Sequence, residues 1–311
     1  MLTSISIKNF KRLKDTGKIK LDSSVVLIGP NNSGKTTCLQ ALSLWLLGVQ
    51  KWLDKRGEAS KAKQRTAVPI NRKDIFAIPI PKSKLLWNNL FVRESERNNG
   101  NRITSTKNVN IEIIIEGITN EKNWTCGLEF EYSGEEVIYC RPIEEIKDNI
   151  INTDPLLIKD IRIAYLPPMS GLISEEFKIL SSTIHVKIGE GSTAEVLRNL
   201  CYQIVNPEYE IMKRYGDPEK NWITIANYMK ELFLIKIDKP FLNDRGAVVL
   251  NYIDENNNEL DLSCAGRGMQ QVLLLFAYLY TNPESILLFD EPDAHLEILR
   301  QREIYNLLVN L

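Results

Sequence analysis

The chain has 311 residues, 39 of them basic and 40 acidic, with 43% hydrophobic and 25% charged side chains. This composition excludes a disordered, collagen-like or membrane-embedded chain, and the length gives room for one large domain or two small ones. The longest apolar runs, 41–49 and 272–280, fall well short of the roughly 18 residues that a membrane span needs, and the first residues lack the apolar core of a signal peptide.

Two histidines and five scattered cysteines limit the chemistry that the chain can carry. Two histidines are too few for a three-histidine zinc site, and they argue against a Ser-His-Asp triad. The cysteines are odd in number and form no C-x-x-C pair, which argues against a disulfide framework or a structural zinc site. We therefore expect a cytoplasmic protein, with Cys38 and Cys264 as small packing residues.

The first part of the chain predicts two strands, a helix and an insertion. Residues 5–10 and 25–28 have strand patterns, and 25–28 is a β-branched run bounded by turn residues. The pattern from 35 to 49 is helical, and Gly48 is expected to close the helix. Residues 50–108 are polar, basic and interrupted by prolines, which predicts a partly ordered insertion.

The rest of the chain predicts a β-meander followed by helices and a hairpin. The strand patterns of the meander lie at 109–116, 124–132 and 137–141, and a further strand at 161–166 ends at Pro167-Pro168. The later predicted elements are helices within 192–234 broken by a turn at 215–218, a hairpin of 247–252 and 259–262, a helix at 268–280, a strand at 285–289 and a helix from 296 onward.

Charge is distributed unevenly along the chain. Residues 51–107 carry fourteen basic and five acidic side chains, a net charge of +9, so the total of -1 leaves -10 on the remainder. A basic segment on an otherwise acidic protein suggests a surface that faces a polyanion such as DNA, but a solvated lysine-rich insertion explains the charge equally well.

The strongest motif is G-P-N-N-S-G-K-T at residues 29–36, which matches the phosphate-loop pattern G-x-x-x-x-G-K-[ST] between a predicted strand and a predicted helix. Backbone N–H groups of such a loop and of the helix N-terminus bind phosphate oxygens, the lysine reaches the β- and γ-phosphates, and the hydroxyl ligates Mg²⁺. The residues assigned to the nucleotide are Gly29, Pro30, Asn31, Asn32, Ser33, Gly34, Lys35, Thr36 and Thr37.

A second candidate site lies at the end of the apolar strand 285–289, where Asp290 and Glu291 follow. Carboxylates at the end of a buried strand can bind Mg²⁺ and polarise a water molecule for attack on a γ-phosphate. An acidic turn after a strand would explain the pair if it stood alone, but its combination with the phosphate loop favours a role in catalysis.

Residues 262–271, L-S-C-A-G-R-G-M-Q-Q, resemble the signature motif of ABC-type ATPases. Ser263 is expected to cap a helix, and Gly266 and Gly268 would expose backbone amides suited to an anion. Taken alone, the segment could also be an ordinary capped helix after a hairpin.

These motifs, with I-K-N-F-K at 7–11 and D-E-P-D-A-H-L at 290–296, resemble the RecF/SMC-like branch of ABC-type ATPases, and most of all the ATPase domain of OLD-family nucleases. The resemblance implies an α/β P-loop NTPase fold, an ABC-type head with a mixed or parallel core sheet, an antiparallel β-meander and a helical subdomain. It implies one domain over 1–311, with the insertion at 50–108, the meander and following strand at 109–166, the helical subdomain at 172–246 and the signature and acidic motifs within 247–311.

The resemblance also implies a function and a set of residue roles. The chain would bind ATP and Mg²⁺ and hydrolyse ATP as a homodimer that sandwiches two nucleotides, with Ser263, Gly266 and Gly268 on the partner's γ-phosphate. Lys35 and Glu291 would be catalytic, and Thr36 and Asp290 would hold the metal. It would regulate DNA processing or cleavage, as in phage defence, together with a Toprim nuclease domain or subunit that this chain does not contain.

The sequence departs from the family pattern in several places. Residues 167–170 offer no Q-loop glutamine, and Glu297 stands where transporters have an aspartate. His295 could contact an interface or a phosphate, or simply start a helix, and Lys11 and Arg12 are further candidates. The chain ends before the family's switch-histidine strand, so we expect an incomplete head.

Two alternatives remain open at this point. A non-hydrolysing, ATP-gated DNA clamp or scaffold would use the same motifs, and phosphate release would distinguish it from an ATPase. The nucleotide-binding subunit of a transporter is a third interpretation, which the opening strand and the 51–107 segment disfavour.

Overall fold

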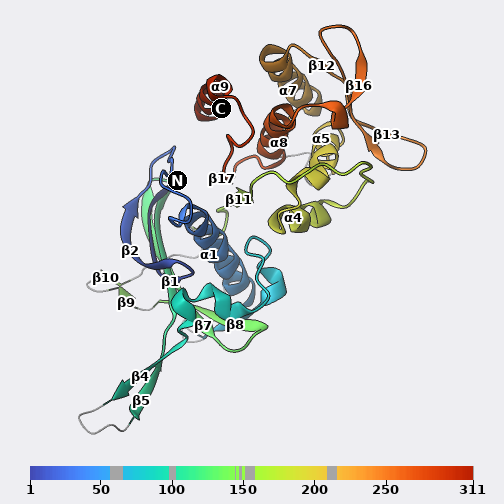
Figure 1. The fold of residues 1–311 in the computed structure, drawn as a ribbon. Helices are drawn as coiled ribbons and strands as arrows, with labels where there is room; N and C mark the ends of the chain where they lie inside the picture. Colours follow the sequence, from blue (N-terminus) through green and yellow to red (C-terminus); the bar gives the residue numbers. More distant parts are fainter. Residues whose placement is uncertain are drawn as a thin grey trace. The chain divides into compact units, whose positions relative to one another are not determined.

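The computed structural model describes residues 1–56, 66–97, 103–143, 145–146, 149–150, 158–208 and 216–310. The chain divides into two compact units, Met1–Ile163 and Ala164–Leu311 (Figure 1). The phosphate loop belongs to the first unit, and the acidic and signature motifs belong to the second.

The first unit is built on a six-stranded sheet with the order β2-β1-β6-β7-β8-β3. Every neighbouring pair is antiparallel, and β6, β7 and β8 follow one another, which confirms the predicted meander. The strands are β1 (Leu2–Phe10), β2 (Leu13–Lys20), β3 (Val68–Asn71), β6 (Ile111–Thr119), β7 (Lys122–Tyr132) and β8 (Val137–Pro142).

Helix α1 (Lys35–Arg56) packs against this sheet. Strand β6 alternates buried and half-buried residues, so Ile111, Ile113 and Ile115 share one buried face, as expected for a sheet covered on one side. On the helix, Trp45 donates its indole N–H to the carbonyl of Cys126 on β7 at 3.1 Å. The apolar side of α1 thus completes the core of the first unit.

The prediction that Gly48 ends this helix was wrong, because the helix continues to Arg56. A Cβ atom at Gly48 would lie 2.8 Å from Leu128, 3.0 Å from Phe130 and 3.0 Å from Cys140. Glycine is therefore found here because α1 approaches β7 and β8 closely, and not because the helix must stop.

Much of the predicted insertion is built into the first unit. Strand β3 joins the sheet beside β8, and Leu86 and Trp87 are fully buried. The same part of the chain contains three short 3-10 helices, η1 (Arg72–Asp74), η2 (Ser83–Leu86) and η3 (Asn88–Leu90).

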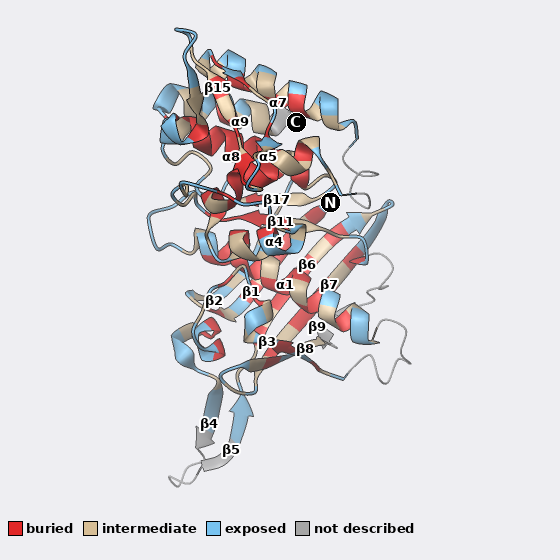
Figure 2. Ribbon diagram, turned by 90° about the vertical axis from the view of Figure 1, so that its right-hand side faces the viewer, coloured by how far each residue is buried: buried red, intermediate tan, exposed pale blue. Residues whose placement is uncertain are grey.

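A separate two-stranded ribbon follows, formed by β4 (Arg93–Arg97) and β5 (Ile103–Asn108) (Figure 2). At its base the backbone N–H of Val109 donates to the carbonyl of Val92 at 3.0 Å. A second small antiparallel pair is formed by β9 (Glu145–Ile146) and β10 (Asn149–Ile150).

The predicted strand at residues 25–28 is not a strand in the structure. Within the described ranges it forms no ladder, and Val25, Val26 and Ile28 are 45%, 63% and 90% exposed. A β-branched run favours an extended backbone. A strand also needs a neighbouring strand for its backbone hydrogen bonds, and the composition of the run does not show whether one is present.

The second unit contains a two-stranded sheet of β11 (Ile163–Leu166) and β17 (Ile286–Phe289), surrounded by helices. Helix α8 (Arg267–Thr281) is almost entirely buried and contacts α5 (Leu197–Val205) and α7 (Pro218–Phe233). The remaining elements are α4 (Ser181–Gly189), η4 (Thr193–Val196), β12 (Lys236–Ile237), β13 (Phe241–Leu242), β14 (Val248–Val249), β15 (Asn251–Ile253), β16 (Glu259–Asp261), η5 (Leu262–Cys264) and α9 (Ile298–Asn310).

Local signals explain the boundaries of these helices. Helix α7 starts where predicted, because Asp217 accepts a hydrogen bond from the N–H of Glu219 and Pro218 occupies the first turn. It ends at Leu234, whose backbone is left-handed. Helix α4 lies in the predicted helical subdomain of 172–246, although no individual helix was predicted there. In the part of the chain that the structure describes, no helix is long and apolar enough to cross a membrane.

Candidate nucleotide site

The phosphate loop connects the extended residues 25–28 to the first turn of α1. The N–H of Ser33 donates to the carbonyl of Pro30 at 3.2 Å, and the N–H of Cys38 donates to the carbonyl of Gly34 at 2.9 Å. Asn32 and Gly34 have positive φ angles of 64° and 105°. The loop is thus a closed turn directly before a helix N-terminus, an arrangement that presents backbone N–H groups to an anion.

The two glycines of the loop are required for different reasons. A Cβ atom at Gly34 would lie 2.9 Å from a methyl carbon of Leu13 at the start of β2, and the positive φ independently favours glycine. A Cβ atom at Gly29 would instead lie 2.8 Å from the Ser33 hydroxyl oxygen, which belongs to the loop itself.

Lys35 spans the loop. Its ammonium donates to the carbonyl of Gly29 at 2.7 Å and to that of Pro30 at 3.0 Å. Thr36 is exposed, whereas the side chain of Thr37 is buried. The Lys35 ammonium thus lies on the loop, and the side chain of Thr37 contributes to packing.

The candidates Lys11 and Arg12 lie in the turn between β1 and β2. The ammonium of Lys11 donates to the side-chain oxygen of Gln40 on α1 at 2.7 Å, and burial lowers the pKa of this ammonium. The side chain of Arg12 is exposed, one residue before Leu13, which contacts Gly34. Of these two candidates, only Arg12 offers an exposed charge beside the loop.

Asp290 lies at the end of β17 and is 6% exposed. Its backbone N–H donates to the carbonyl of Leu166 on β11 at 3.0 Å, and the Tyr165 hydroxyl donates to its Oδ2 at 3.1 Å. The Tyr278 hydroxyl of α8 donates in turn to the carbonyl of Tyr165 at 3.0 Å. Strand β11 thus holds both the backbone and the carboxylate of Asp290, and Tyr278 of α8 bonds β11 in turn; no sequence pattern had pointed to either tyrosine.

The turn after β17 carries two residues in the left-handed region, Glu291 at φ 51° and His295 at φ 65°. The N–H of Ala294 donates to the carbonyl of Glu291 at 3.1 Å, which closes the turn. Non-glycine residues with positive φ are uncommon and store strain. Glu291, His295 and Glu297 are all exposed, so their side chains are open to a ligand or a partner.

The signature segment runs from η5 into α8. Asp261, and not Ser263, supplies the cap of η5, because its Oδ1 accepts the N–H of Ser263 at 2.8 Å. Gly266 is the N-cap of α8 and has no side-chain cap. The expectation that Ser263 caps a helix was wrong, whereas Gly266 and Gly268 do lie at the helix N-terminus. Ser263 and Gly266 are exposed.

The start of α8 and the turn after β17 contact each other within the second unit. A Cβ atom at Gly268 would lie 3.0 Å from the carbonyl oxygen of His295. Gln271 donates from its side-chain amide to the carbonyl of Pro292 at 3.3 Å. Gln271 was not predicted, since only the fold brings α8 beside a turn about twenty residues later.

Each of the two units offers an oxygen donor of the kind that Mg²⁺ accepts. Among the residues that the structure describes, no group of three or more histidine, cysteine or acidic residues is arranged to hold a metal ion. Mg²⁺ usually takes one or two protein oxygens together with phosphate oxygens and water. The Thr36 hydroxyl of the first unit and the Asp290 carboxylate of the second unit are each an oxygen donor of this kind.

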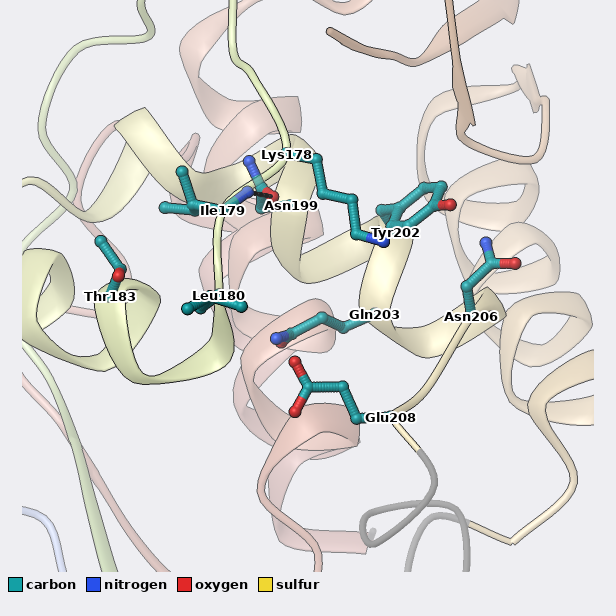
Figure 3. Close-up of a pocket in the computed structure, with 9 residues that line it drawn as sticks. All are labelled: Lys178, Ile179, Leu180, Thr183, Asn199, Tyr202, Gln203, Asn206 and Glu208. Carbon is teal, nitrogen blue, oxygen red and sulfur yellow. Dashed lines mark hydrogen bonds between the residues drawn. The ribbon is translucent and has the colours of Figure 1, made fainter. Parts of the chain in front are cut away.

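A pocket of about 490 Å³ lies elsewhere in the second unit, between residues 178–183 and α5 (Figure 3). Lys178 lies over the ring of Tyr202, 5.4 Å from its centroid, and Glu208 lies at the far end. None of the predicted site residues lines it.

Comparison with known proteins shows the kind of fold. Residues 1–123 match the family model of an "AAA ATPase domain", and residues 180–311 match one described as "AAA domain, putative AbiEii toxin, Type IV TA system". No curated protein sequence matches the chain.

Among solved structures, an Smc head bound to the C-winged helix domain of ScpA is similar, with a TM-score of 0.51 and 14% identity over 99% of this chain and 85% of that one. An SMC head from Thermotoga maritima has a TM-score of 0.42 at 14% identity, covering 99% and 83%. An Smc head bound to a ScpA domain derived from Pyrococcus furiosus has a TM-score of 0.48 at 13% identity, over 99% of this chain and 86% of that one.

The Smc head with the TM-score of 0.51 shows an α/β P-loop ATPase fold, so the predicted fold class is confirmed. The two ATPase-domain matches, each over less than half of the chain, agree with this fold.

Proposed function

We propose that this chain hydrolyses ATP with Mg²⁺, as a head that dimerises around two nucleotides. The observation that carries the proposal is the phosphate loop, a closed turn at the start of α1 whose Gly34 has a φ of 105° and whose Lys35 ammonium lies over the loop carbonyls. Such a loop binds the β-phosphate through backbone N–H groups and the γ-phosphate through lysine.

The residue roles follow from the chemistry of each group. Lys35 would neutralise charge on the β- and γ-phosphates, and Thr36 and Asp290 would hold Mg²⁺. The metal supplies positive charge that stabilises the transferred phosphoryl oxygens. Asp290 suits a metal ligand because the Tyr165 hydroxyl and the Leu166 carbonyl fix it at the end of β17.

Glu291 would act as the general base. Its exposed carboxylate would accept a proton from the attacking water, and the oxygen of that water would bond to the γ-phosphorus as the bond to the β-phosphate oxygen breaks. The closed turn from Glu291 to Ala294 supports this role, since it holds the residue in a costly left-handed conformation.

The second unit would recognise the nucleotide bound by a partner copy. Ser263 and Gly266 are exposed at the start of a helix whose N-terminus has no side-chain cap, so its backbone N–H groups remain open to a γ-phosphate. Dimerisation through this contact would make turnover depend on two chains.

The substitution Glu291→Gln tests the proposal. Because the amide cannot accept the proton but keeps the size of the side chain, we expect unchanged ATP affinity, a loss of phosphate release of about 100-fold or more, and an ATP-dependent dimer that persists. Phosphate release, nucleotide binding and light scattering measure these three effects, with Glu297→Gln as a matched exposed control in the same segment.

Turnover at the wild-type rate in the Glu291→Gln variant would remove Glu291 from catalysis. If the wild-type protein binds ATP and dimerises without releasing phosphate, the alternative of an ATP-gated clamp replaces the ATPase.

We further propose, from the resemblance to OLD-family proteins, that the head regulates DNA processing or cleavage together with a Toprim nuclease domain or subunit, as in phage defence. This partner is a separate proposal, and the Glu291→Gln experiment does not depend on it. Stimulation of a Toprim nuclease by this chain only when ATP is present would support it.

A further inference from the structure

Arg198, on the first turn of α5, is a buried charge that the proposed mechanism does not use. Its side chain is 2% exposed, and an ionised group so far from water requires a partner. Its Nη2 donates to Asp261 Oδ1 at 2.8 Å, and its Nη1 donates to the carbonyl of Ile173 at 3.2 Å.

The same oxygen of Asp261 also accepts the backbone N–H of Ser263 at 2.8 Å. One atom therefore joins Arg198 to the signature loop. Burial opposes the ionisation of Asp261, but the hydrogen bonds from Ser263 and the charge of Arg198 outweigh it and lower the pKa of the carboxyl. The carboxylate stays charged and keeps both donors.

The backbone of Arg198 is fixed as well. Buried Glu176 accepts the N–H of Arg198 at 3.0 Å and that of Asn199 at 2.6 Å, so it caps the N-terminus of α5 from outside the helix. The Asn199 side-chain amide donates to the same carboxylate at 2.8 Å. Arg198 is thus held at both ends, its backbone by Glu176 and its guanidinium by Asp261.

Stability alone does not account for this arrangement. A buried ion pair is weak evidence for stability, since an apolar pair of the same volume is often equally stable. An apolar pair, however, could not accept the hydrogen bond that fixes the backbone N–H of Ser263.

We propose that Arg198 is a positioning residue of the signature loop, which acts through Asp261 to fix the backbone of Ser263 and so to orient residues 263–266 toward the phosphate of a partner copy. This inference rests on the proposed function for its effect on turnover, but the hydrogen bond to Ser263 can be tested without it.

The test compares Arg198→Met with Lys239→Met. Methionine keeps much of the side-chain volume of arginine without its charge, and Lys239 forms an exposed ion pair with Glu219 at 2.6 Å, so its loss is a matched control. In Arg198→Met we expect hydrogen exchange at the Ser263 amide to accelerate about tenfold or more, the size expected when one charge-assisted hydrogen bond is removed. Phosphate release and ATP-dependent dimerisation should fall by about as much, while ATP affinity stays within about twofold. Lys239→Met should change none of these.

The double variant Arg198→Met with Asp261→Asn serves if the single variant does not fold. It also removes the carboxylate charge that Arg198 pairs with, and asparagine can still accept the Ser263 N–H. Because Arg198 no longer holds the side chain at position 261 in place, we expect the same fast exchange of the Ser263 backbone amide and the same loss of turnover. Combining Arg198→Met with Ser263→Ala should lower turnover no further than either change alone, because both act on the same loop interaction.

Wild-type exchange at Ser263 in both Arg198 variants would overturn the inference. Fast exchange with wild-type turnover would show that Arg198 holds the loop but that the loop does not serve catalysis, which overturns the signature role. If the wild-type protein neither turns over ATP nor dimerises, the proposed function fails, while the exchange measurement still decides whether Arg198 positions Ser263.

Discussion

Cys38 and Cys264 lie in the two nucleotide motifs but have opposite surroundings. Cys38 is buried in α1, and burial raises the pKa of its thiol to about 11. Cys264 is exposed in the signature segment. The expectation of a packing residue fits Cys38 and was wrong for Cys264, because the sequence pattern does not show that η5 turns this side chain outward.

We predict that a thiol reagent at about pH 7.5 modifies one cysteine per folded chain and all five after unfolding. Cys264 is exposed, whereas the other four are buried and their thiolates are disfavoured. Absorbance of released thionitrobenzoate gives the count, and Cys264→Ser should reduce the fast phase to zero. A second fast thiol in the folded protein would contradict the burial of Cys38.

The residues that were predicted and those that were missed differ in how far their interactions reach along the chain. The turn of Gly29 to Thr36 before α1 was predictable because its pattern consists of neighbouring residues in a fixed order. Tyr165, which bonds Asp290, and Arg198, which bonds Asp261, act across 125 and 63 residues. Nothing local distinguishes them from other buried residues, so only the fold reveals them.

At the scale of elements, α1 shows how tertiary packing decides a position that propensity leaves open. Glycine is a poor helix former, and the sequence pattern alone favoured ending the helix at Gly48. The packing of the helix on β7 and β8 stabilises the additional turns to Arg56 and leaves no space for a side chain at this position.

We expect Gly48→Ala to lower the free energy of unfolding by roughly 1–3 kcal/mol, because overpacking against Leu128, Phe130 and Cys140 exceeds the gain of up to about 1 kcal/mol in helix propensity. Urea unfolding measures the change. Gly134→Ala is the control, since a Cβ atom there has no neighbour within 4 Å. Equal or greater stability of Gly48→Ala would show that α1 can move away from the sheet.

The meander and residues 25–28 show what sequence patterns can predict about strands. Strands β6, β7 and β8 are consecutive and joined by short turns, so each strand finds its partner next to it along the chain. Residues 25–28 have an equally good strand composition but no such neighbour, and in the described structure they remain exposed. Composition predicts extension, whereas pairing depends on topology.

Over the whole molecule, the basic segment 51–107 is partly neutralised by the fold. Arg72 pairs with Glu136 at 3.0 Å and Lys82 with Glu135 at 2.8 Å, both acidic residues outside the segment, whereas Lys51 pairs at 2.8 Å with Asp74, which the net charge of +9 already includes. Lys73, Lys84, Arg93 and Lys107 are exposed, and Lys61, Lys63 and Arg65 lie outside the described residues. The charge available to a polyanion is therefore smaller than the sequence count.

We propose that this segment binds DNA, and we predict that Lys61, Lys63 and Arg65 changed together to glutamate weaken binding about tenfold or more. For every DNA phosphate that the variant no longer neutralises, the slope of log K against log salt should become shallower by about 0.9. Fluorescence anisotropy over a salt series measures both effects. The control, Lys220, Lys230 and Lys236 changed to glutamate, makes the same charge change on the other unit and should have less effect. Equal loss of affinity in both variants would assign binding to net charge and not to this segment.

The ribbon of β4 and β5 has a consequence for engineering of the protein. The chain enters and leaves the ribbon at Val92 and Val109, which are joined by a backbone hydrogen bond of 3.0 Å, and both strands of the ribbon pair only with each other among the described strands. Because the two ends of the ribbon are so close together, replacing the chain between them costs little loop-closure entropy. The base of the ribbon is therefore a natural graft point, where a fluorescent or affinity module could replace the hairpin while the strand pairing of the six-stranded sheet is kept, at the loss of the hydrogen bond from the Asn108 side chain of β5 to Glu131 of β7.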